Sequence, residues 1–500
     1  MVPTSRSNWH TETSGLFELS ERVYDFTLLK RTKIIATLGP STDKPGMLHR
    51  VLESGVDLVR VNLSHGTLDS HKERIEATRA CAAALGKTVG IIIDLQGPKI
   101  RIAQFKKGSI DLPVDAKFII DADLAIEAGT EQAVGIDYKN LPKEVYPSDI
   151  LLLDDGLIML SVEKVEGQKI YCVVKLGGSL SNNKGINRRG GGLSAEPLTH
   201  KDREDIQFAA KMNVDYVAVS FPRSASDIHQ ARLLLEQAGS VAGILAKIER
   251  VEAVDDLDNI IESADGVMVA RGDLGVEIGY AELPAIQKRI IARARALNRA
   301  VITATQMMES MVHNPIPTRA EVSDIANAIL DGTDAVMLSA ETATGNFPDK
   351  AVEAMVEVCL AAERQRIMKI SHHRLESRFA HVNETIAMAA MYAANHIDTR
   401  AIVALTETGL TPLWMSRIRS GIPIYGLSRN VSARGRMTLY RGVYPINFDV
   451  TRSSKDHVTS DALAELLRLG AITIGDRVVV TKGDTMGNSV GATTLQIITV

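Results

Sequence analysis

The chain alternates between short apolar runs and longer stretches with apolar residues at helical spacing. Eight of the runs are rich in β-branched residues, and most are followed by polar residues and then by a stretch such as "AVEAMVEVCLAAE". Such runs predict strands, and the spacing of alanine and leucine between them predicts helices. The eight predicted strands are "KIIATLG" (33–39), "VDLVRVNLS" (56–64), "TVGIIIDLQ" (88–96), "VDYVAVSFP" (214–222), "GILAKIE" (243–249), "DGVMVARGD" (265–273), "AVITATQMM" (300–308) and "DAVMLSAET" (334–342).

Eight strand–helix units predict an α/β fold in which a parallel sheet closes into a (β/α)₈ TIM barrel. Chemistry in that fold lies at the C-terminal ends of the strands, and these ends are polar here. Residues two apart on a strand share a face, so Arg60, Asn62 and Ser64 line one wall. One charged strand end is often a solvated turn, but five that converge favour a functional site. The other polar ends carry Asp94, Lys247, Glu249, Arg271, Asp273 and Thr305.

The regular spacing breaks once, between the third and fourth runs, which are separated by about 115 residues. This stretch contains short predicted strands with turn residues between them, and no long helix is evident. It predicts an inserted all-β domain over residues 99–196, which grows from the catalytic face of the barrel and could act as a lid.

A third α/β unit follows the eighth strand. Its predicted strands are "AIVALTE" (401–407), "IPIYGLS" (422–428), "VYPINF" (443–448) and "DRVVVTKG" (476–483). The boundary is expected near residue 366, in the basic stretch "RQRIMKISHHRLESR". This stretch contains His372 and His373, and His381 follows it closely. We interpret these three histidines as exposed linker residues rather than as a metal site. The barrel is therefore expected over 31–98 and 197–366, and the C-terminal domain over 367–500.

Composition narrows the class of protein. The chain has 500 residues, 45% of them hydrophobic, with a net charge of −4 and only 4% aromatic residues. Nucleic-acid binding is disfavoured, because it needs a basic face and stacking platforms. No segment approaches the ~20 apolar residues of a membrane span, so no membrane partner is expected. The first 30 residues do not resemble a signal peptide; they read as a polar extension with one amphipathic piece, "LFELSERVYDF".

The cysteines are three in number, far apart and without a CxxC pair. Cys81, Cys172 and Cys359 therefore disfavour a structural zinc site and a disulfide framework. We expect three buried thiols in a reducing cytoplasm.

The motifs of common nucleotide and hydrolase sites are absent or weak. There is no Walker A sequence, HExxH or GxSxG, and "GGGLSA" (190–195) follows two arginines rather than a strand. The barrel rim instead combines two carboxylates, Glu249 and Asp273, with Lys247 and Arg60. Such carboxylates suit Mg²⁺, and the cations suit an anion clamp for phosphoryl transfer. "ARGDLG" looks like a loop whose N–H groups can hold a carboxylate or phosphate. The alternative is a set of rim salt bridges.

Several longer stretches resemble the pyruvate kinase family, from about residue 31 to 500. They are "RTKIIATLGPST", "VRVNLSHG", "LLLDDG", "NNKGIN", "AKIER", "MVARGDLGVEI", "TATQMMESM" and "PTRAEVSDIANAILDGTDAVMLSAETATGNFP". The resemblance implies transfer of phosphate from phosphoenolpyruvate to ADP, a β-barrel lid and a C-terminal α/β regulatory domain. It also implies a cytoplasmic homotetramer that uses Mg²⁺, with Mn²⁺ as an alternative.

The resemblance implies a role for each matching residue. Lys247 would stabilise the transferring phosphoryl group, and Arg60 would contact it. Glu249 and Asp273 would hold the divalent ion. Gly272 and Asp273 N–H groups and the Thr305 hydroxyl would bind the substrate carboxylate, and either Thr305 or a water chain would deliver the proton. Nucleotide contacts are expected from Asn62, His65, Arg101 and Lys184. The family's monovalent-cation site matches Asn62, Ser64, Asp94 and Leu95.

The chain departs from the commoner family form in two places. Where that form reads D-T-K-G-P-E-I-R, this chain has "DLQGPKIR", with Leu95, Gln96 and Lys99. The Lys99 ammonium can supply the unit charge of K⁺ and offers Asp94 a possible ion-pair partner, so K⁺ is expected not to be required. The alternative is a Lys99 that points to solvent. Ala340, where glycine is usual, is expected to be tolerated.

The C-terminal domain carries a candidate effector loop, "TETGLTP" (406–412), between a strand and a helix. Its hydroxyls, glycine and helix N-terminus can form a phosphate cradle from Thr406, Thr408, Gly409 and Thr411. The alternative is a plain capping turn. The chain resembles the bacterial branch of the family that is activated by sugar monophosphates or AMP. Two other functions stay open: another Mg²⁺-dependent barrel enzyme acting on enolates (an aldolase or lyase), or a non-catalytic regulatory binder.

Overall fold

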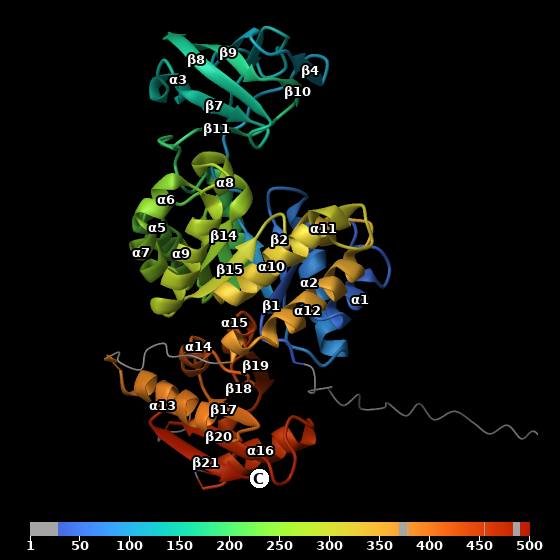
Figure 1. Cartoon of the computed structure of the whole chain (residues 1–500), viewed down its shortest axis with the longest axis vertical. Helices are drawn as coiled ribbons and strands as arrows, with labels where there is room; N and C mark the ends of the chain where they lie inside the picture. The colour runs from blue at the N-terminus through green and yellow to red at the C-terminus, as the bar shows by residue number, and fades with distance from the viewer. Residues whose placement is uncertain (1–28, 370–377, 380, 455, 484–490) are drawn as a thin grey trace, which may run out of the picture.

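The structure, a computed structural model, describes residues 29–369, 378–379, 381–454, 456–483 and 491–500. Three parts follow one another along its longest axis, with an all-β domain at one end, a barrel in the middle and an α/β domain at the other end (Figure 1). Most of the expected N-terminal extension, with its amphipathic piece, lies outside the described residues. So do His372 and His373 of the expected linker.

All eight predicted barrel runs form strands, and these close into one parallel barrel. The order around the barrel is β1-β16-β15-β14-β13-β12-β3-β2, and β1 closes the ring on β16. The fold class predicted from the sequence is therefore confirmed. The strands are β1 (Lys33–Thr37), β2 (Leu58–Asn62), β3 (Gly90–Asp94), β12 (Tyr216–Val219), β13 (Gly243–Ile248), β14 (Gly266–Ala270), β15 (Ala300–Ala304) and β16 (Ala335–Leu338).

Helices surround the barrel, and several begin at strong sequence signals. Thr67, Thr199 and Thr318 each cap a helix through a reciprocal capping box. The elements of this outer layer are α1 (Met47–Glu53), α2 (Leu68–Ala84), α4 (His200–Lys211), α5 (Ala225–Gln237), α6 (Val251–Asp255), α7 (Leu257–Ser263), α8 (Arg271–Ile278), α9 (Leu283–Ala296), α10 (Arg319–Asp331), α11 (Ala340–Ala343) and α12 (Pro348–Glu363), with 3₁₀ turns η2 (Glu309–Val312) and η3 (Arg366–Met368).

The segment between β3 and α4 forms the separate all-β domain, with one short helix, α3 (Leu141–Glu144). Its strands build a six-stranded sheet, β11-β7-β8-β9-β5-β6, and a two-stranded sheet, β10-β4, around a core of their own. The strands are β4 (Ser109–Leu112), β5 (Lys117–Asp121), β6 (Ala133–Gly135), β7 (Ile150–Leu153), β8 (Ile158–Glu166), β9 (Lys169–Leu176), β10 (Gly178–Ser181) and β11 (Ile186–Arg188).

The C-terminal part is a five-stranded sheet of order β19-β18-β17-β20-β21. Four of these strands were predicted, and β21, which pairs antiparallel with β20, was missed. The elements are α13 (Val382–His396), β17 (Ala401–Leu405), α14 (Leu410–Ser416), β18 (Ile424–Ser428), α15 (Val431–Met437), β19 (Val443–Asn447), η4 (Val450–Arg452), α16 (Val458–Arg468), β20 (Arg477–Lys482) and β21 (Thr494–Thr499).

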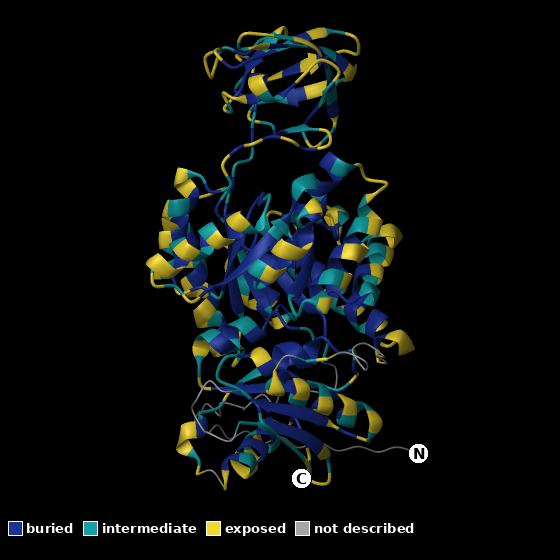
Figure 2. Cartoon of the chain, turned by 90° about the vertical axis from the view of Figure 1, so that its left-hand side faces the viewer, coloured by how far each residue is buried: buried dark blue, intermediate teal, exposed yellow. Residues whose placement is uncertain are grey.

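The barrel and the C-terminal part share one hydrophobic cluster. Ile35 and Leu58 of the barrel strands belong to the same buried cluster as Met415 and Met437 of the C-terminal helices. Figure 2 shows the barrel strands mostly buried, while many exposed residues lie on the outer helices. The junction is therefore a packed core.

The cysteines differ from expectation in one respect. All three are free thiols, but only Cys172 and Cys359 are buried, and Cys81 on α2 is half-buried. A cysteine on the outer layer of a barrel can face the surface. No helix in the described part of the chain has the length and apolar character needed to cross a membrane.

Candidate active site

The polar ends of β2, β3 and β13 meet around one buried carboxylate, Asp94. The Arg60 Nε donates to Asp94 Oδ2 at 2.6 Å, and the Lys247 ammonium lies 3.3 Å from Asp94 Oδ1. The Asp94 side chain is 1% exposed, whereas Arg60 and Lys247 are each 12% exposed. Asp94 therefore holds both cations in place, and their side chains still reach the open end of the barrel.

Lys247 is held by three groups on neighbouring strand ends. Its ammonium lies 2.9 Å from Glu249 Oε1 and donates to Ser220 Oγ at 2.8 Å, besides its contact with Asp94. Burial alone lowers the pKa of Lys247, but the charges of Asp94 and Glu249 outweigh it and raise the pKa above its usual value. The ammonium therefore stays charged at neutral pH.

The two buried carboxylates respond to this environment in opposite ways. Burial raises the pKa of Asp94, but the charges of Lys247 and Arg60 outweigh it, and the pKa is lowered. For Glu249, burial and the charges of Asp273 and Asp94 raise the pKa more than Lys247 lowers it. The repulsion from Asp273 means that a cation between Glu249 and Asp273 would be favoured.

Asp273 lies in a helix, which corrects the sequence interpretation of "ARGDLG". Strand β14 ends at Ala270, and α8 begins at Arg271, so Asp273 lies in the first helical turn rather than on a strand end or in a loop. Two glycines in a short segment are typical of a loop, but here they permit a helix to start directly at the strand end. The first backbone N–H groups of α8 remain suited to an anion.

Thr305 faces this helix start from the end of β15. The Gly272 N–H donates to Thr305 Oγ1 at 2.9 Å, and the same hydroxyl donates to the Ala304 carbonyl at 2.7 Å. Thr305 and Gln306 both have positive φ angles, 64° and 53°. Strained backbone of this kind is concentrated at functional sites.

The donor set fits a magnesium ion. Within the described residues no group of three or more His, Cys, Asp or Glu side chains forms a metal-binding cluster. Glu249 and Asp273 are two carboxylates near enough to repel each other, and Mg²⁺ commonly uses one or two carboxylates with waters and substrate oxygens. The set is too sparse for a closed protein-only metal site.

Lys99 does not pair with Asp94, so that part of the sequence interpretation is wrong. Its ammonium lies 2.8 Å from Asp273 Oδ1 and 3.6 Å from Asp155 Oδ1, and the side chain is 23% exposed. Asp94 already has Arg60 and Lys247 as partners. Lys99 therefore joins the all-β domain to the barrel carboxylate instead of pointing to solvent.

The residues expected to contact a nucleotide lie in two places. Asn62 ends β2 and accepts from the Ser64 N–H at 3.2 Å, with His65 exposed just beyond. Arg101 lies in the all-β domain, next to Gly185 in an isolated bridge that also brings it near Lys184. Arg101 donates to the Asn183 carbonyl at 3.0 Å, and Lys184 pairs with Asp154 at 2.8 Å.

Sequence reasoning missed Ser220 and overrated Arg271. Ser220 donates to the Leu95 carbonyl at 2.7 Å and accepts from Lys247, so it links two members of the site. It follows β12 as the other polar residues follow their strands, and that position could have identified it. Arg271 is buried and pairs with Asp324 at 2.6 Å, which makes it a structural residue.

The candidate effector loop lies between β17 and α14. The Gly409 N–H donates to Thr406 Oγ1 at 2.9 Å, and the Leu410 N–H donates to Thr408 Oγ1 at 3.4 Å. Gly409 has a φ of 83°, and Thr411 is buried. Two of the three hydroxyls thus act as caps in the loop.

Comparison with known proteins gives a consistent result along the chain. Residues 29–352 match the family model "Pyruvate kinase, barrel domain", and residues 384–498 match "Pyruvate kinase, alpha/beta domain". The chain is 54% identical to pyruvate kinase II of Salmonella typhimurium over 478 residues, which cover 94% of this chain and 99% of the relative. It is 54% identical to the pyruvate kinase of Haemophilus influenzae over 459 residues, 91% of this chain and 96% of the relative. The pyruvate kinase of Geobacillus stearothermophilus is 39% identical over 470 residues, 93% of this chain and 79% of the relative.

Proposed function

Because the chain belongs to the pyruvate kinase family and is a phosphotransferase, we propose that it transfers the phosphoryl group of phosphoenolpyruvate to ADP, giving pyruvate and ATP as the last step of glycolysis in the cytoplasm. The observation that carries this proposal is the Lys247 ammonium, which is fixed between Asp94 and Glu249 at the open end of the barrel.

Lys247 and Arg60 bind the phosphoryl group, and the charge on Lys247 offsets the negative charge that spreads over the oxygens during transfer. Both cations are positioned before substrate binds, so little reorganisation is needed in the transition state. Mg²⁺, or Mn²⁺ in its place, would be held by Glu249 and Asp273 and would supply positive charge to the substrate oxygens.

The substrate carboxylate binds at the start of α8. The N–H groups of Gly272 and Asp273 and the hydroxyl of Thr305 are its donors. The Gly272 N–H donates to Thr305 Oγ1, so a bound carboxylate would compete with the hydroxyl for this donor. Thr305 also lies near the carbon that receives the proton, which comes from its hydroxyl or from a water chain.

The nucleotide phosphates bind Asn62 and His65 on the barrel side and Arg101 and Lys184 on the all-β side, so residues 99–196 act as a lid. Lys99, whose ammonium lies at Asp273, supplies the unit charge of K⁺, and Asn62, Ser64, Asp94 and Leu95 remain as the relic of the monovalent-cation site. Residues 367–500 form an effector domain that binds a phosphorylated sugar or AMP, and the chain assembles as a homotetramer.

The test is pyruvate formation from phosphoenolpyruvate, measured with and without ADP in Mg²⁺ buffer. Pyruvate that appears only with ADP supports the proposal. Release without ADP would favour an aldolase- or lyase-type enzyme, and no release would favour a binder.

Lys247→Met tests the central cation in the same assay. Loss of one preorganised charged group of this kind costs ~3–4 kcal/mol or more, so the turnover number should fall about 10²-fold to 10³-fold. Lys350→Met, at an exposed lysine of α12, is the matched control and should keep its rate. Near-normal turnover of Lys247→Met would rule out the role.

A further inference from the structure

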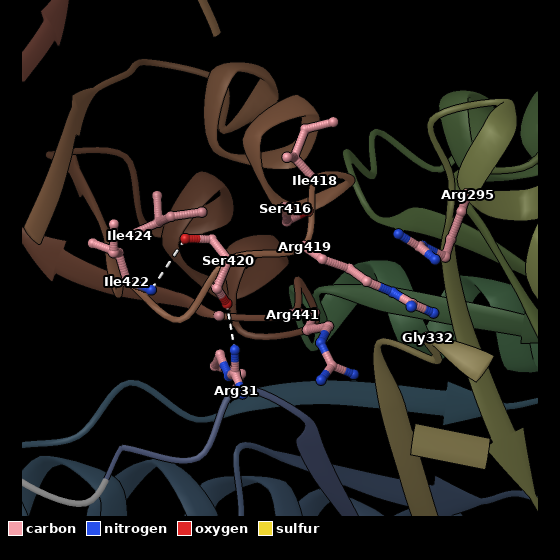
Figure 3. A pocket seen from close by; sticks show the side chains of 11 residues that line it. Arg31, Arg295, Gly332, Ser416, Ile418, Arg419, Ser420, Ile422, Ile424 and Arg441 are labelled. Atoms are coloured by element: carbon pink, nitrogen blue, oxygen red, sulfur yellow. Dashed lines mark hydrogen bonds between the residues drawn. The ribbon is translucent and has the colours of Figure 1, made fainter. Parts of the chain in front are cut away.

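A cavity lined by arginines lies at the opposite end of the barrel from the candidate active site, where the barrel meets the C-terminal domain. The space between the lining residues, with the open solvent at its mouth included, is about 360 Å³. Arg31 and Arg295 line it from the barrel side, and Arg419 and Arg441 line it from the C-terminal side. In Figure 3 the guanidinium groups of Arg295, Arg419 and Arg441 point into the space between the two parts.

Among the described residues, the carboxylates nearest this cavity already have cationic partners. Glu363 is shared between Arg31 and Arg441, at 3.5 Å from each. Asp334 is fully buried and forms an ion pair with Arg417. Asp331, which acts on Arg419 from farther away, is already paired with Lys288.

Positive charge therefore accumulates among the described residues of the cavity. Burial and the charges of Arg417 and Arg419 lower the pKa of Arg295 to about 9. Burial also lowers the pKa of Arg419 and of Arg441. Like charges that repel in a poorly hydrated space favour the entry of an anion.

Unused donors point in the same direction. Arg419 Nε is buried and has no hydrogen-bond partner in the described part of the structure, and the polar contact of Arg441 Nη2 there is the ion pair with Glu363 at 3.5 Å. The other nitrogens of these side chains donate to main-chain carbonyls: Arg419 to Leu330 and Ile367, and Arg441 to Thr333. These bonds hold the guanidinium groups in place, and they leave the Arg419 Nε–H group for a ligand, with the Arg441 Nη2 group held only by its ion pair. Buried donors without partners are costly, so they call for an acceptor.

We propose that this cavity, between the barrel and the C-terminal domain, binds a phosphate group through Arg295, Arg419 and Arg441. Guanidinium groups on three different elements suit a tetrahedral dianion, because each fork can meet a different pair of oxygens. Either free phosphate or the phosphate of a small monoester supplies this chemistry. A bound phosphate would tie α9 to the segments after α14 and α15, and so link the two parts of the chain. The proposal does not depend on the catalytic reaction or on the effector loop.

The experiment is calorimetric titration of the full chain with inorganic phosphate at constant ionic strength, without Mg²⁺ or substrate. The titrated protein carries Thr406→Ala and Thr411→Ala, so that the proposed effector loop does not contribute. One phosphate per chain is expected, with a matching rise in melting temperature. No binding would overturn the proposal, and it would leave the proposed reaction untouched.

Variants in the same background locate the site. Arg295→Gln and Arg419→Gln should each weaken phosphate binding at least tenfold. Arg452→Gln, whose side chain is 86% exposed on the C-terminal domain, is the matched control and should bind normally. Arg419→Lys keeps the positive charge but loses the two parallel N–H donors of the guanidinium, so its affinity for phosphate should fall by an intermediate factor. This conservative variant also tests the site if a Gln variant does not fold. Equal binding by all variants would overturn the assignment.

A titration with methyl phosphate distinguishes the two sources. If it binds in competition with inorganic phosphate, the site accepts monoesters. If only inorganic phosphate binds, the site takes the free ion. Binding of methyl phosphate without such competition would place it elsewhere and overturn the monoester reading.

Discussion

At the scale of single residues, the proposed replacement of K⁺ depends on the charge of Lys99. Burial lowers its pKa, but the Asp273 and Asp155 charges outweigh it and raise the pKa, so the ammonium stays charged. A second positive unit charge ~4 Å from the Lys99 ammonium would be repelled by roughly 4 kcal/mol at an effective dielectric constant near 20. We therefore expect Lys99 both to supply a positive charge and to discourage K⁺ from binding beside it.

We expect full activity with Mg²⁺ in a buffer free of K⁺, made with tetramethylammonium salt at constant ionic strength. Lys99→Glu should lose activity there and recover part of it when K⁺ is added, because a carboxylate would then face Asp273. Lys107→Glu, at an exposed lysine of the same domain, should behave as wild type. A wild-type rate that rises tenfold or more on adding K⁺ alone would contradict this role.

The sequence located the individual site residues better than their contacts. Arg60, Asp94 and Lys247 were identified because each lies at the C-terminal end of an otherwise apolar strand. Their convergence on Asp94 depends on which strands become neighbours: β12 joins β3 although about 120 residues separate them. Lys99 was assigned to Asp94 because both lie in "DLQGPKIR", but after the Gly97 turn its long side chain reaches Asp273 instead.

At the scale of elements, the buried strands were predictable and the exposed or unusual ones were not. The barrel strands are apolar at nearly every position because they are covered on both faces. β21 was missed because "TLQIIT" is half-exposed at an edge and has no continuous apolar run. The start of α8 was taken for a loop because helix propensity disfavours glycine, and the packing of Leu274 and Val276 outweighs that cost.

The loop between β17 and α14 is the element on which the proposed regulation depends. Thr406 and Thr408 cap backbone N–H groups in the free loop, so a bound phosphate must compete for the same donors. Thr406→Ala combined with Thr411→Ala should abolish activation by sugar monophosphates or AMP, seen as a loss of the effector's shift in the phosphoenolpyruvate saturation curve.

Thr385→Ala, at a threonine whose hydroxyl donates within α13, is the control and should leave activation intact. If the double variant still responded to every sugar phosphate and to AMP, the loop would be only a capping turn.

At the scale of the whole molecule, the junction between the barrel and the C-terminal domain contains a carboxylate with a perturbed pKa. Burial raises the pKa of Asp215 to about 6, although the Ile91 N–H, Arg79 and Arg436 act in the opposite direction. Helix α15 packs so closely here that a Cβ on Gly435 would overlap the Asp215 carboxylate. Ionisation of the Asp215 carboxyl in this enclosed place therefore destabilises the folded state.

The sign of the pH effect follows from this raised pKa. The stability contributed by protonated Asp215 is fully present below the unfolded-state pKa, near 3.8, and is lost as pH rises through about 6. Asp215→Asn keeps the acceptor for Ile91 but cannot ionise. It should therefore be more stable than wild type by about 1–3 kcal/mol at pH 8, with little difference at pH 4. Denaturant unfolding at both pH values measures this, and an equal difference at both would contradict it.

The closure of the barrel by β1 against β16 has a consequence during synthesis. Lys33 pairs with Ala335, so the first strand waits for a partner made about 300 residues later. At ~5–20 residues per second, the ribosome takes roughly 15–60 s to supply it. During that time the apolar edge of β1 stays open to other nascent chains, while the inserted all-β domain has its own core and can fold first. During this long period the new chain can aggregate through the open edge of β1, and chaperones that shield this edge would then be most effective.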